Sequence, residues 1–239
     1  FERNESIERI ECLLKCEATK VFIRNGKKYK KLSEHIGLLP TVMISPSDVD
    51  LINDGSQTRR GFIDRLIGQA DKTYLHQLIQ YQKILQQRNA LLKQMGRYGQ
   101  GENDTLEIYN AQLVSLGAPI HKTRMEYLST FEPLFKKRYA AISGAEENVS
   151  VSYQSQLLNE DFEKLLENAA TQDRIAQFST VGVHKDDLVF QIDEYPIKKF
   201  GSQGQRKSLL IALKLAQFDM LKQSTAVKPL LLLDDIFDK

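Results

Sequence analysis

Two stripes of large side chains at helical spacing occupy the middle of the chain and restrict the folds open to it. In the first stripe, positions recur at alternating steps of four and three residues, which is typical of a coiled-coil seam. In the second, they recur every seven residues. A glycine-containing stretch separates the two, so we expect two helices that fold back on each other as an antiparallel arm. The stripes consist of Tyr74, Leu78, Tyr81, Leu85, Arg88, Leu92 and Met95, and of Leu106, Leu113, Ile120, Tyr127 and Leu134.

These stripe residues are interpreted as mutual packing and not as chemistry. Pro119 and Pro133 interrupt the second stripe. Because proline lacks an amide hydrogen and its ring collides with the preceding turn, we expect that helix to kink or split. Gly96, Gly99 and Gly101 are not followed by the Lys-Ser/Thr pair of a phosphate-binding loop, and they are interpreted as a flexible turn.

Strand patterns precede the arm. Residues 1–43 alternate in places and contain Asn25-Gly26, a dipeptide typical of a two-residue hairpin turn. A short helix is expected near residues 32–36. Residues 41–44 predict a further strand, which Ser45-Pro46 ends.

Strand patterns also follow the arm. Residues 148–153 alternate and predict a strand, and residues 188–192 predict another that closes with a turn near residues 193–196. Between them we expect one helix, capped by Asn159 and extending to about Gln177. The chain therefore leaves a sheet, continues along helices and returns to the sheet.

The segment FGSQGQRKS, residues 200–208, predicts the start of a helix, because apolar residues recur at helical spacing directly after it. The first turn of a helix has free backbone N–H groups and about half a positive charge from the helix dipole, which suits a phosphate. An ordinary helix cap at Ser202 is the alternative interpretation. The apolar residues are Leu209, Leu210, Leu213, Leu215 and Ala216.

The segment PLLLLDD, residues 229–235, predicts a short central strand of a parallel sheet, covered on both faces and ending in two acids. Ligands of open α/β sheets gather at the carboxyl edge of the strands. One carboxylate there can hold Mg²⁺ through its water shell while a second orients an attacking water. Two solvated acids are the alternative, but the helix start and the acidic strand in this order are more specific than either alone.

Both segments resemble known motifs. Residues 200–217 resemble the signature region, and residues 229–238 the Walker B strand, of ABC-type ATPase heads of the SMC and Rad50 class. Residues 41–64, 81–93 and 182–188 resemble the local patterns of one family in that class, the RecF family of bacterial recombinational-repair proteins, and follow its order. The resemblance covers nearly the whole chain.

The resemblance implies an α/β fold, a partial ABC-ATPase head of the P-loop type with an inserted antiparallel, coiled-coil-like helical arm. Residues 1–45 would form the N-terminal remnant of the head and residues 46–146 the arm. Residues 147–239 would form the C-terminal part of the head, with the signature and Walker B.

The sequence contains no G-x-x-x-x-G-K-[ST] motif, so the loop whose amides and lysine hold nucleotide phosphates is absent from these residues. In the family this loop lies upstream of the region that matches Phe1, and the chain begins without Met. We therefore expect a fragment. Alone, it is expected to bind no ATP or Mg²⁺ and to be inactive, whereas the intact protein would be a slow, DNA-stimulated ATPase that binds both.

The resemblance also implies roles for individual residues. Asp234 would hold Mg²⁺ through water, and Asp235, the catalytic residue, would orient the hydrolytic water. Ser45 stands where other heads have a glutamine that senses the γ-phosphate, so it is a possible sensor. The signature residues that would contact the ATP held by a partner molecule are Ser202, Gln203, Gly204 and Gln205.

Basic residues cluster after the Ser-Pro stop, near the base of the arm and around the signature. A run of charge is usually a solvated face, and the net charge of +2 permits a nucleic-acid surface without requiring one. No aromatic residues are interleaved with these clusters in a way that favours stacking on unpaired bases, so sequence-independent contact with DNA phosphates is the predicted mode. The candidates for DNA binding are Arg59, Arg60, Lys198, Lys199, Arg206 and Lys207.

The resemblance further implies an ATP-dependent homodimer that clamps double-stranded and gapped DNA and assists RecA loading with RecO- and RecR-type partners. It implies roles in DNA repair, recombination, replication and the SOS response, in the bacterial cytoplasm at the nucleoid. A structural SMC-like head without significant hydrolysis and the nucleotide-binding subunit of an ABC transporter are alternatives. The arm disfavours the transporter, and no apolar run is long enough for a membrane span.

Three further residues are given structural roles. His184 lies beside two acids, but a hydrogen-bonding role where arm and head meet is favoured over a metal ligand. Cys12 and Cys16 have no accompanying Cys or His with zinc-site spacing, and they are interpreted as free thiols.

Overall fold

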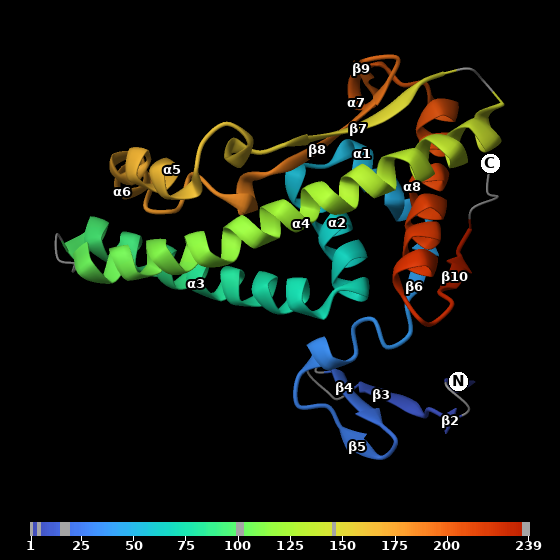
Figure 1. Ribbon diagram of the computed structural model, residues 1–239, viewed down its shortest axis with the longest axis horizontal. Coiled ribbons are helices and arrows are strands. Elements are labelled where there is room, and N and C mark those ends of the chain that lie inside the picture. Colours follow the sequence, from blue (N-terminus) through green and yellow to red (C-terminus); the bar gives the residue numbers. More distant parts are fainter. Residues whose placement is uncertain (1, 4–5, 15–19, 99–102, 145–146, 236–239) are drawn as a thin grey trace.

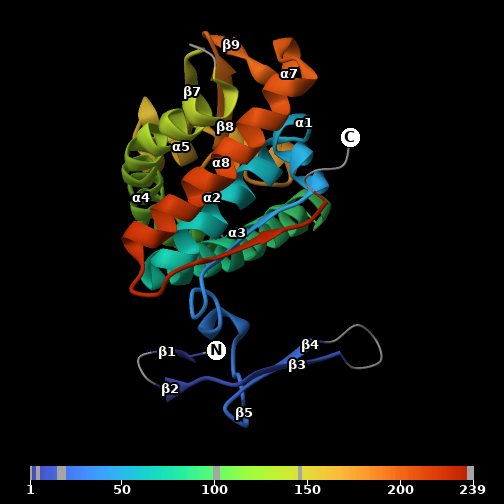
Figure 2. The ribbon, with the colours of Figure 1, turned by 90° about the vertical axis from the view of Figure 1, so that its right-hand side faces the viewer.

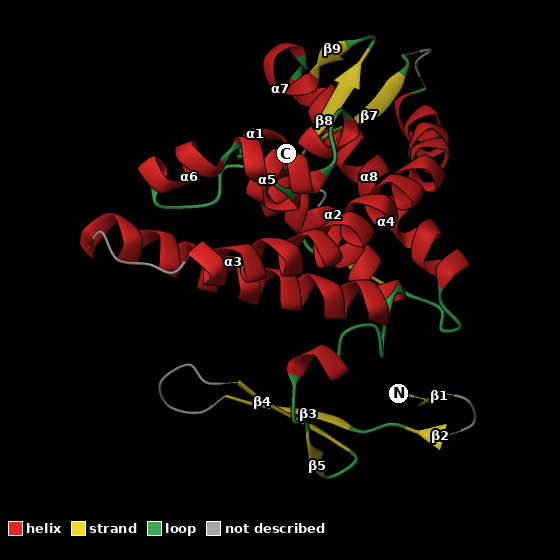
Figure 3. Cartoon of the chain, turned by 60° about the vertical axis from the view of Figure 1, so that its left-hand side comes forward, coloured by secondary structure: helices red, strands yellow, loops and turns green. Residues whose placement is uncertain are grey.

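The computed structural model describes residues 2–3, 6–14, 20–98, 103–144 and 147–235. Figure 1 shows a small lobe of strands at the N-terminus and a larger body that contains the long helices. Figure 3 shows the same separation, with the strands of the lobe below the helices of the body. One cluster of buried apolar side chains connects the elements of the body.

The lobe is built from short antiparallel strands. β1 (Glu2–Arg3) pairs with β2 (Ser6–Ile7), and a separate sheet has the order β3 (Ile10–Leu14), β4 (Lys20–Arg24), β5 (Lys27–Lys28). Asn25 and Gly26 have φ of 49° and 77°, which confirms the predicted hairpin turn. A 3-10 helix, η1 (Leu32–Glu34), confirms the short helix expected there. Cys12 is a free, exposed thiol, and Cys16 lies outside the described residues.

A two-stranded parallel sheet carries the predicted acidic edge. β6 (Thr41–Ile44) pairs in parallel with β10 (Leu230–Leu233), with Leu230 opposite Thr41 and Leu233 opposite Ile44. The predicted burial of β10 on both faces is wrong for the described residues, because Leu230, Leu232 and Leu233 are about half exposed (45%, 48% and 53%). Within the described part, β6 is the only strand that pairs with β10, so its other edge has no partner there.

The arm consists of α3 (Lys72–Tyr98) and α4 (Asn103–Ser143), which lie antiparallel in Figure 1. The predicted seam is confirmed, since Leu92, Leu113 and Ile120 are fully buried. Gly96 lies inside α3, and the other two glycines of the predicted turn lie outside the described residues. α4 does not split at its two prolines but continues as one helix that bends along its length (Figure 1).

Three short elements connect β6 to the arm: η2 (Pro46–Val49), α1 (Asp50–Asn53) and α2 (Ser56–Ala70). α2 buries Phe62, Ile63, Leu66 and Ile67 in the same core as the body. The segment 46–146 therefore begins with helices that pack in the body before the chain enters α3. The three-part division of the chain stays a proposal.

The returning strands form an antiparallel sheet in the order β7 (Val149–Gln154), β8 (Asp187–Ile192), β9 (Tyr195–Pro196). In the described residues this sheet is separate from the β6–β10 sheet, so the expected return of these strands to the sheet that the chain left is wrong there. Buried residues alternate along β7 and β8, so one face of this sheet packs on the core. The predicted turn is confirmed at Asp193 and Glu194, whose φ are 48° and 70°.

The single helix predicted between these strands is wrong. The segment contains η3 (Gln156–Leu158), α5 (Phe162–Asn168), α6 (Ala170–Ala176) and η4 (Val183–Lys185). Asn159 closes η3 instead of opening a helix, and Asp161 precedes α5. The buried Asp173 of α6 accepts a hydrogen bond of 2.6 Å from the buried Arg88 of α3, and this ion pair anchors the segment on the arm.

The chain then enters α7 (Ile197–Phe200) and α8 (Gln203–Ser224). α8 packs against α4 and buries Leu209, Leu213 and Ala216 completely, as the helical spacing predicted. An ion pair between Arg138 of α4 and Asp219 of α8, with both N–O distances 2.6 Å, ties the two helices together.

Candidate nucleotide site

The amino end of α8 begins at the predicted residue. The Ser202 hydroxyl accepts a hydrogen bond from the Gln205 backbone N–H (3.2 Å), and the Gln205 side-chain oxygen accepts one from the Ser202 N–H (2.7 Å). This reciprocal capping box fixes where the helix starts. Gly204 is exposed, and no atom lies within 4 Å of the position a Cβ would occupy there. Its backbone is therefore open to a close approach by a ligand.

The acids lie at the carboxyl end of the parallel sheet, as predicted. The Asp234 backbone N–H donates to the Ile44 carbonyl (2.9 Å), which extends the pairing of the two strands by one residue. Both Asp234 and Asp235 are exposed. Asp235 has φ of 46°, in the left-handed region that few residues other than glycine adopt. This backbone conformation ends the strand abruptly and turns the chain.

A cleft of about 690 Å³ lies between these two elements. It brings together five of the predicted residues and has apolar walls from β6, η2 and α8. Four others, Ser202, Gly204, Gln205 and Asp234, are next to lining residues in the sequence without lining the cleft themselves. The predicted residues that line it are Ser45, Gln203, Arg206, Lys207 and Asp235.

Lys214 and Asp48 fix this cleft, and neither was singled out from the sequence. The Lys214 ammonium, on the buried side of α8, contacts the Asp48 carboxylate (2.6 Å) and donates to the Met43 carbonyl (2.9 Å). The ion pair thus joins α8 to the end of β6. A lysine inside the apolar repeat of a helix was the available signal, because such a lysine needs a buried partner.

Ser45 lies at the cleft end of β6. Its backbone N–H donates to the Asp48 carboxylate (2.9 Å), and its hydroxyl is 2.8 Å from the Ser47 hydroxyl. The hydroxyl therefore belongs to a small polar group at the cleft wall. Its role as a nucleotide sensor stays a prediction.

Arg59 and Arg60 are engaged within the body. Arg59 forms a two-bond ion pair with Asp187 (2.7 and 2.9 Å) and donates to the Asp54 carbonyl (2.8 Å). Arg60 donates to the Asp186 carbonyl (2.6 Å). Both side chains hold α2 against the start of β8, a structural role that the sequence did not indicate. Their contact with DNA stays a prediction.

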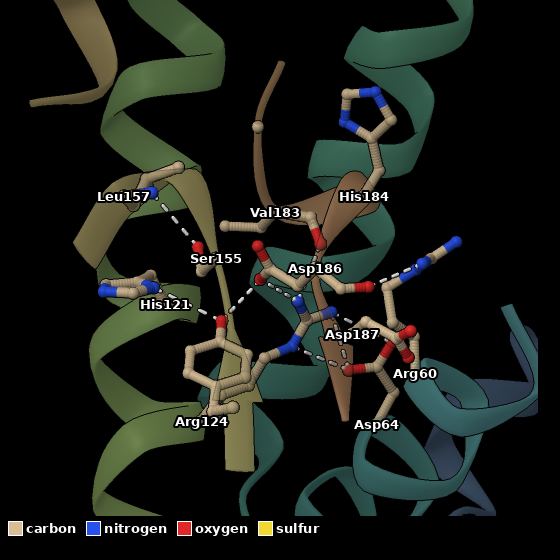
Figure 4. Close-up of polar contacts among 12 residues, drawn as sticks. Arg60, Asp64, His121, Arg124, Ser155, Leu157, Val183, His184, Asp186 and Asp187 are labelled. Carbon is tan, nitrogen blue, oxygen red and sulfur yellow. Dashed lines mark hydrogen bonds and ion pairs between the residues drawn. The ribbon is translucent and has the colours of Figure 1, made fainter. Parts of the chain in front are cut away.

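A buried arginine joins the arm to the body (Figure 4). The guanidinium of Arg124, from α4, lies between the carboxylates of Asp64 on α2 (2.9 Å) and Asp186 (2.7 Å). It also donates to the Val183 carbonyl (2.8 Å). Burial alone would lower the pKa of Arg124, but Tyr74 and the two carboxylates raise it, so the group stays charged. Position 124 lies outside the heptad stripe, which is why the sequence pattern missed it.

His184 has the structural role expected of it. Its Nδ1 lies 2.9 Å from the Tyr81 hydroxyl of α3, and its Nε2 lies 3.1 Å from the Ser179 carbonyl. Because a carbonyl only accepts, Nε2 carries the proton and Nδ1 accepts from Tyr81. In the described part of the chain, no group of three or more His, Cys, Asp or Glu is placed to hold a metal.

We expect His184 to make stability depend on pH. Burial lowers the pKa of His184 to about 4, whereas the pKa in the unfolded chain is about 6.5. The unfolded state therefore binds more protons between these values, and stability falls as the pH decreases from about 6.5 to 4, by about 2–3 kcal/mol. Urea unfolding at several pH values measures this loss.

The control for this prediction is His184→Gln, which keeps a donor and an acceptor but does not titrate. Burial also lowers the pKa of His35 and His121, so the wild type loses stability from those groups as well. The difference between wild type and variant isolates His184. A difference that stays constant from pH 7 to pH 4 would contradict the assignment.

The body mixes helices and sheets, an antiparallel helical arm is inserted between its strands, and a helix start lies beside an acidic strand edge. These features define part of an ABC-type ATPase head. Proteins named "DNA replication and repair protein RecF" align with the whole chain. The one from Flavobacterium johnsoniae is 55% identical over 239 residues, and the one from Azobacteroides pseudotrichonymphae is 46% identical over 239 residues. The chain belongs to the RecF family.

The chain covers 67% and 65% of the length of these two relatives. Two solved structures are also similar. The one described as "recombination mediator protein RecF-ATP in RecFOR pathway" has a TM-score of 0.89, and the one described as RecF-ATPrS has a TM-score of 0.88. Each is 34% identical and matches 97% of this chain, which covers 65% and 64% of theirs, respectively. No family model matches the chain.

Proposed function

We propose that this chain is the ATP-gated, DNA-binding head of a recombinational-repair ATPase, in which two molecules close on each other when ATP binds. The cleft between the amino end of α8 and the acidic end of β10 carries this proposal. It combines the amino end of a helix and two basic side chains with a carboxylate, which together suit a magnesium nucleotide. A related structure described as RecF-ATP supports nucleotide binding by the family.

In the closed dimer, Ser202 and Gly204 of one molecule approach the γ-phosphate bound to its partner. A two-fold dimer presents the same face of both molecules, so each face needs the helix end and the acids together. Both elements border one cleft, which meets this requirement. Gln203 and Gln205 belong to the same helix start.

Asp234 holds Mg²⁺ through water, and Asp235 orients the water that attacks the γ-phosphate. The two acids suit this ion, because Mg²⁺ usually keeps several waters and takes only one or two carboxylates together with phosphate oxygens. Ser45, across the cleft, is placed in the proposal as the sensor of the bound state.

The closed dimer binds double-stranded and gapped DNA, mainly through contacts with the DNA phosphates. The RecFOR pathway named for the similar structures supports partners of the RecO and RecR type. Assistance to RecA loading is part of the same proposal. We place the protein in the bacterial cytoplasm at the nucleoid. Within the described part, no helix is long and apolar enough to cross a membrane.

The test is ATP-dependent dimerisation of the full gene product carrying Ser202→Asp. Aspartate is as good a helix cap as serine, so the fold should be preserved, but its charge repels the partner's γ-phosphate. We expect dimerisation with ATP and Mg²⁺ to weaken about 30-fold, measured by light scattering after gel filtration.

The matched control is Ser129→Asp on the exposed face of the arm, which adds the same charge without an expected effect. Dimers of Ser202→Asp as stable as those of the control would contradict the proposal. ATP hydrolysis with and without DNA separates a working ATPase from a structural head.

A further inference from the structure

Two aromatic side chains lie exposed where β9 leads into α7. Tyr195 is 62% exposed and Phe200 is 66% exposed. Their ring centroids are 5.6 Å apart and their planes are 70° apart, an edge-to-face contact. Figures 1 and 2 place β9 and α7 at the end of the body opposite the N-terminal lobe. Because aromatic rings contribute most when they are covered, such an exposed pair indicates a contact surface.

A hollow of about 340 Å³ lies beside these rings. Tyr195 and Phe200 form part of its wall, together with the buried Ile197 and the backbone at Gly201. Asp193 and Gln205 also line the hollow, so its wall combines the two rings and apolar side chains with two polar side chains. This wall suits a flat group that lies against a ring face and has hydrogen-bonding groups at its edge.

Within the described residues, the cations next to the rings donate to backbone carbonyls and not to carboxylates. The Lys198 ammonium donates to the Asp54 carbonyl (3.1 Å), and the Arg206 guanidinium donates to the carbonyls of Gly201 (3.0 Å) and Lys198 (3.2 Å). Lys199 is exposed. None of these three cations forms an ion pair with a carboxylate among the residues that the structure describes. Carbonyl groups satisfy the donors but leave the net charge in place.

Two acids directly precede Tyr195 in the sequence. Asp193 and Glu194 form the turn before Tyr195, and the Asp193 carboxylate accepts a hydrogen bond from the Asn148 N–H (2.9 Å). Glu194 is exposed. The acids thus precede Tyr195 in the chain, whereas Lys198 and Lys199 lie between the two aromatic residues, so a polyanion would approach from the side of α7.

We propose that Tyr195 and Phe200 are a stacking site for unpaired bases of single-stranded nucleic acid, whose phosphates lie along Lys198 and Lys199. Flat faces, an adjoining hollow and uncompensated cations are the combination that binds single strands with little sequence preference. In a duplex the base faces are already stacked, so the rings select unpaired bases. The inference rests on the proposed DNA-binding function and adds a site for the single-stranded side of a gap.

This proposal departs from the sequence interpretation that no aromatics are interleaved with the basic clusters. In the segment YPIKKF, Phe200 directly follows Lys199, and Tyr195 lies three residues before Lys198. The pattern was overlooked because aromatic residues that border strands and helices are usually buried, and the sequence does not show that these two are exposed.

The chain contains no tryptophan, so Phe200→Trp introduces a single indole as a reporter. We expect a 15-nucleotide oligothymidylate to quench its fluorescence, because a stacked base quenches indole, and a duplex of equal length to leave it unchanged. In a second experiment, binding of a fluorescently labelled single strand is measured by anisotropy. The double variant Tyr195→Ala, Phe200→Ala should bind it about tenfold more weakly than the wild type. Binding of the duplex should change less than threefold.

The matched control is Ile175→Ala with Phe178→Ala, which removes another exposed apolar pair and should change neither affinity. Glu194→Gln should strengthen single-strand binding about twofold, since it removes a repulsive charge. Equal quenching by both DNAs, or none by either, would overturn the proposal. So would an emission shift that follows protein concentration without DNA, because the rings would then contact a second copy of the chain.

The outcome separates this inference from the proposed function. If wild-type protein binds the duplex and only the single-strand effects fail, the stacking site alone is wrong. If ATP-dependent dimerisation is also insensitive to Ser202→Asp, the proposed function fails as well.

Discussion

Asp235→Asn in the full gene product is expected to reduce ATP hydrolysis about 10²-fold or more while ATP-dependent dimers still form. An amide has the size of the carboxylate but does not accept a proton from the attacking water, and general-base catalysis typically contributes at least this factor. Asp235 lies on the cleft wall in a left-handed conformation, and it ends the strand that brings it there. Steady-state phosphate release, with and without DNA, measures the effect.

Two variants sharpen this experiment. Asp235→Glu keeps the carboxylate and should retain hydrolysis, whereas Asp104→Asn removes an exposed acid on the arm and should have no effect. If Asp235→Asn hydrolyses ATP within about threefold of the wild type, Asp235 is not the base. Dimers that outlast those of the wild type would support the proposed order of events, because the nucleotide would remain intact.

Arg124→Met is expected to lower the free energy of unfolding by about 3–5 kcal/mol. The side chain is 2% exposed and lies between two carboxylates, so its removal leaves Asp64 and Asp186 in a site with little solvent. Urea unfolding followed by circular dichroism measures the loss.

Arg97→Met near the exposed end of α3 is the control and should cost less than about 0.5 kcal/mol. If Arg124→Met prevents folding, Arg124→Lys, which keeps the charge but loses several hydrogen bonds, gives a measurable intermediate. Adding Asp64→Asn and Asp186→Asn to Arg124→Met should restore part of the stability. A loss below about 1 kcal/mol for Arg124→Met would show that the junction does not depend on this charge.

Sequence periodicity predicted the helices and strands in which apolar residues recur at regular spacing. The arm, the start of α8 at Ser202 and the strands at residues 41–44 and 230–233 follow from local spacing and capping. The pairing of these two strands with each other was not predicted. The helix break at Ala169 was missed, because no proline or glycine marks it. The continuity of α4 through Pro119 and Pro133 was missed because packing along its whole length outweighs the lost hydrogen bonds.

The candidate site was predicted in part, because local sequence patterns identify some of its residues. Its two motifs are contiguous in sequence, and local pattern identifies them. The ion pairs that position the site join residues far apart in the chain, such as Asp48 with Lys214 and Asp64 with Arg124. Such pairs leave no periodic trace in one sequence. The exposure of Tyr195 and Phe200 is likewise a property of the tertiary fold.

Because α4 is one continuous helix, a rotation at one of its ends also moves the other end. At 1.5 Å per residue, its 41 residues span about 60 Å. One end packs on α8, where Arg138 and Asp219 form a joint through an ion pair, and the other lies along α3. A tilt of about 5° at that joint would displace the far tip by roughly 5 Å. A small shift of α8 at Asp219 would therefore move the tip of the arm further than α8 itself moves.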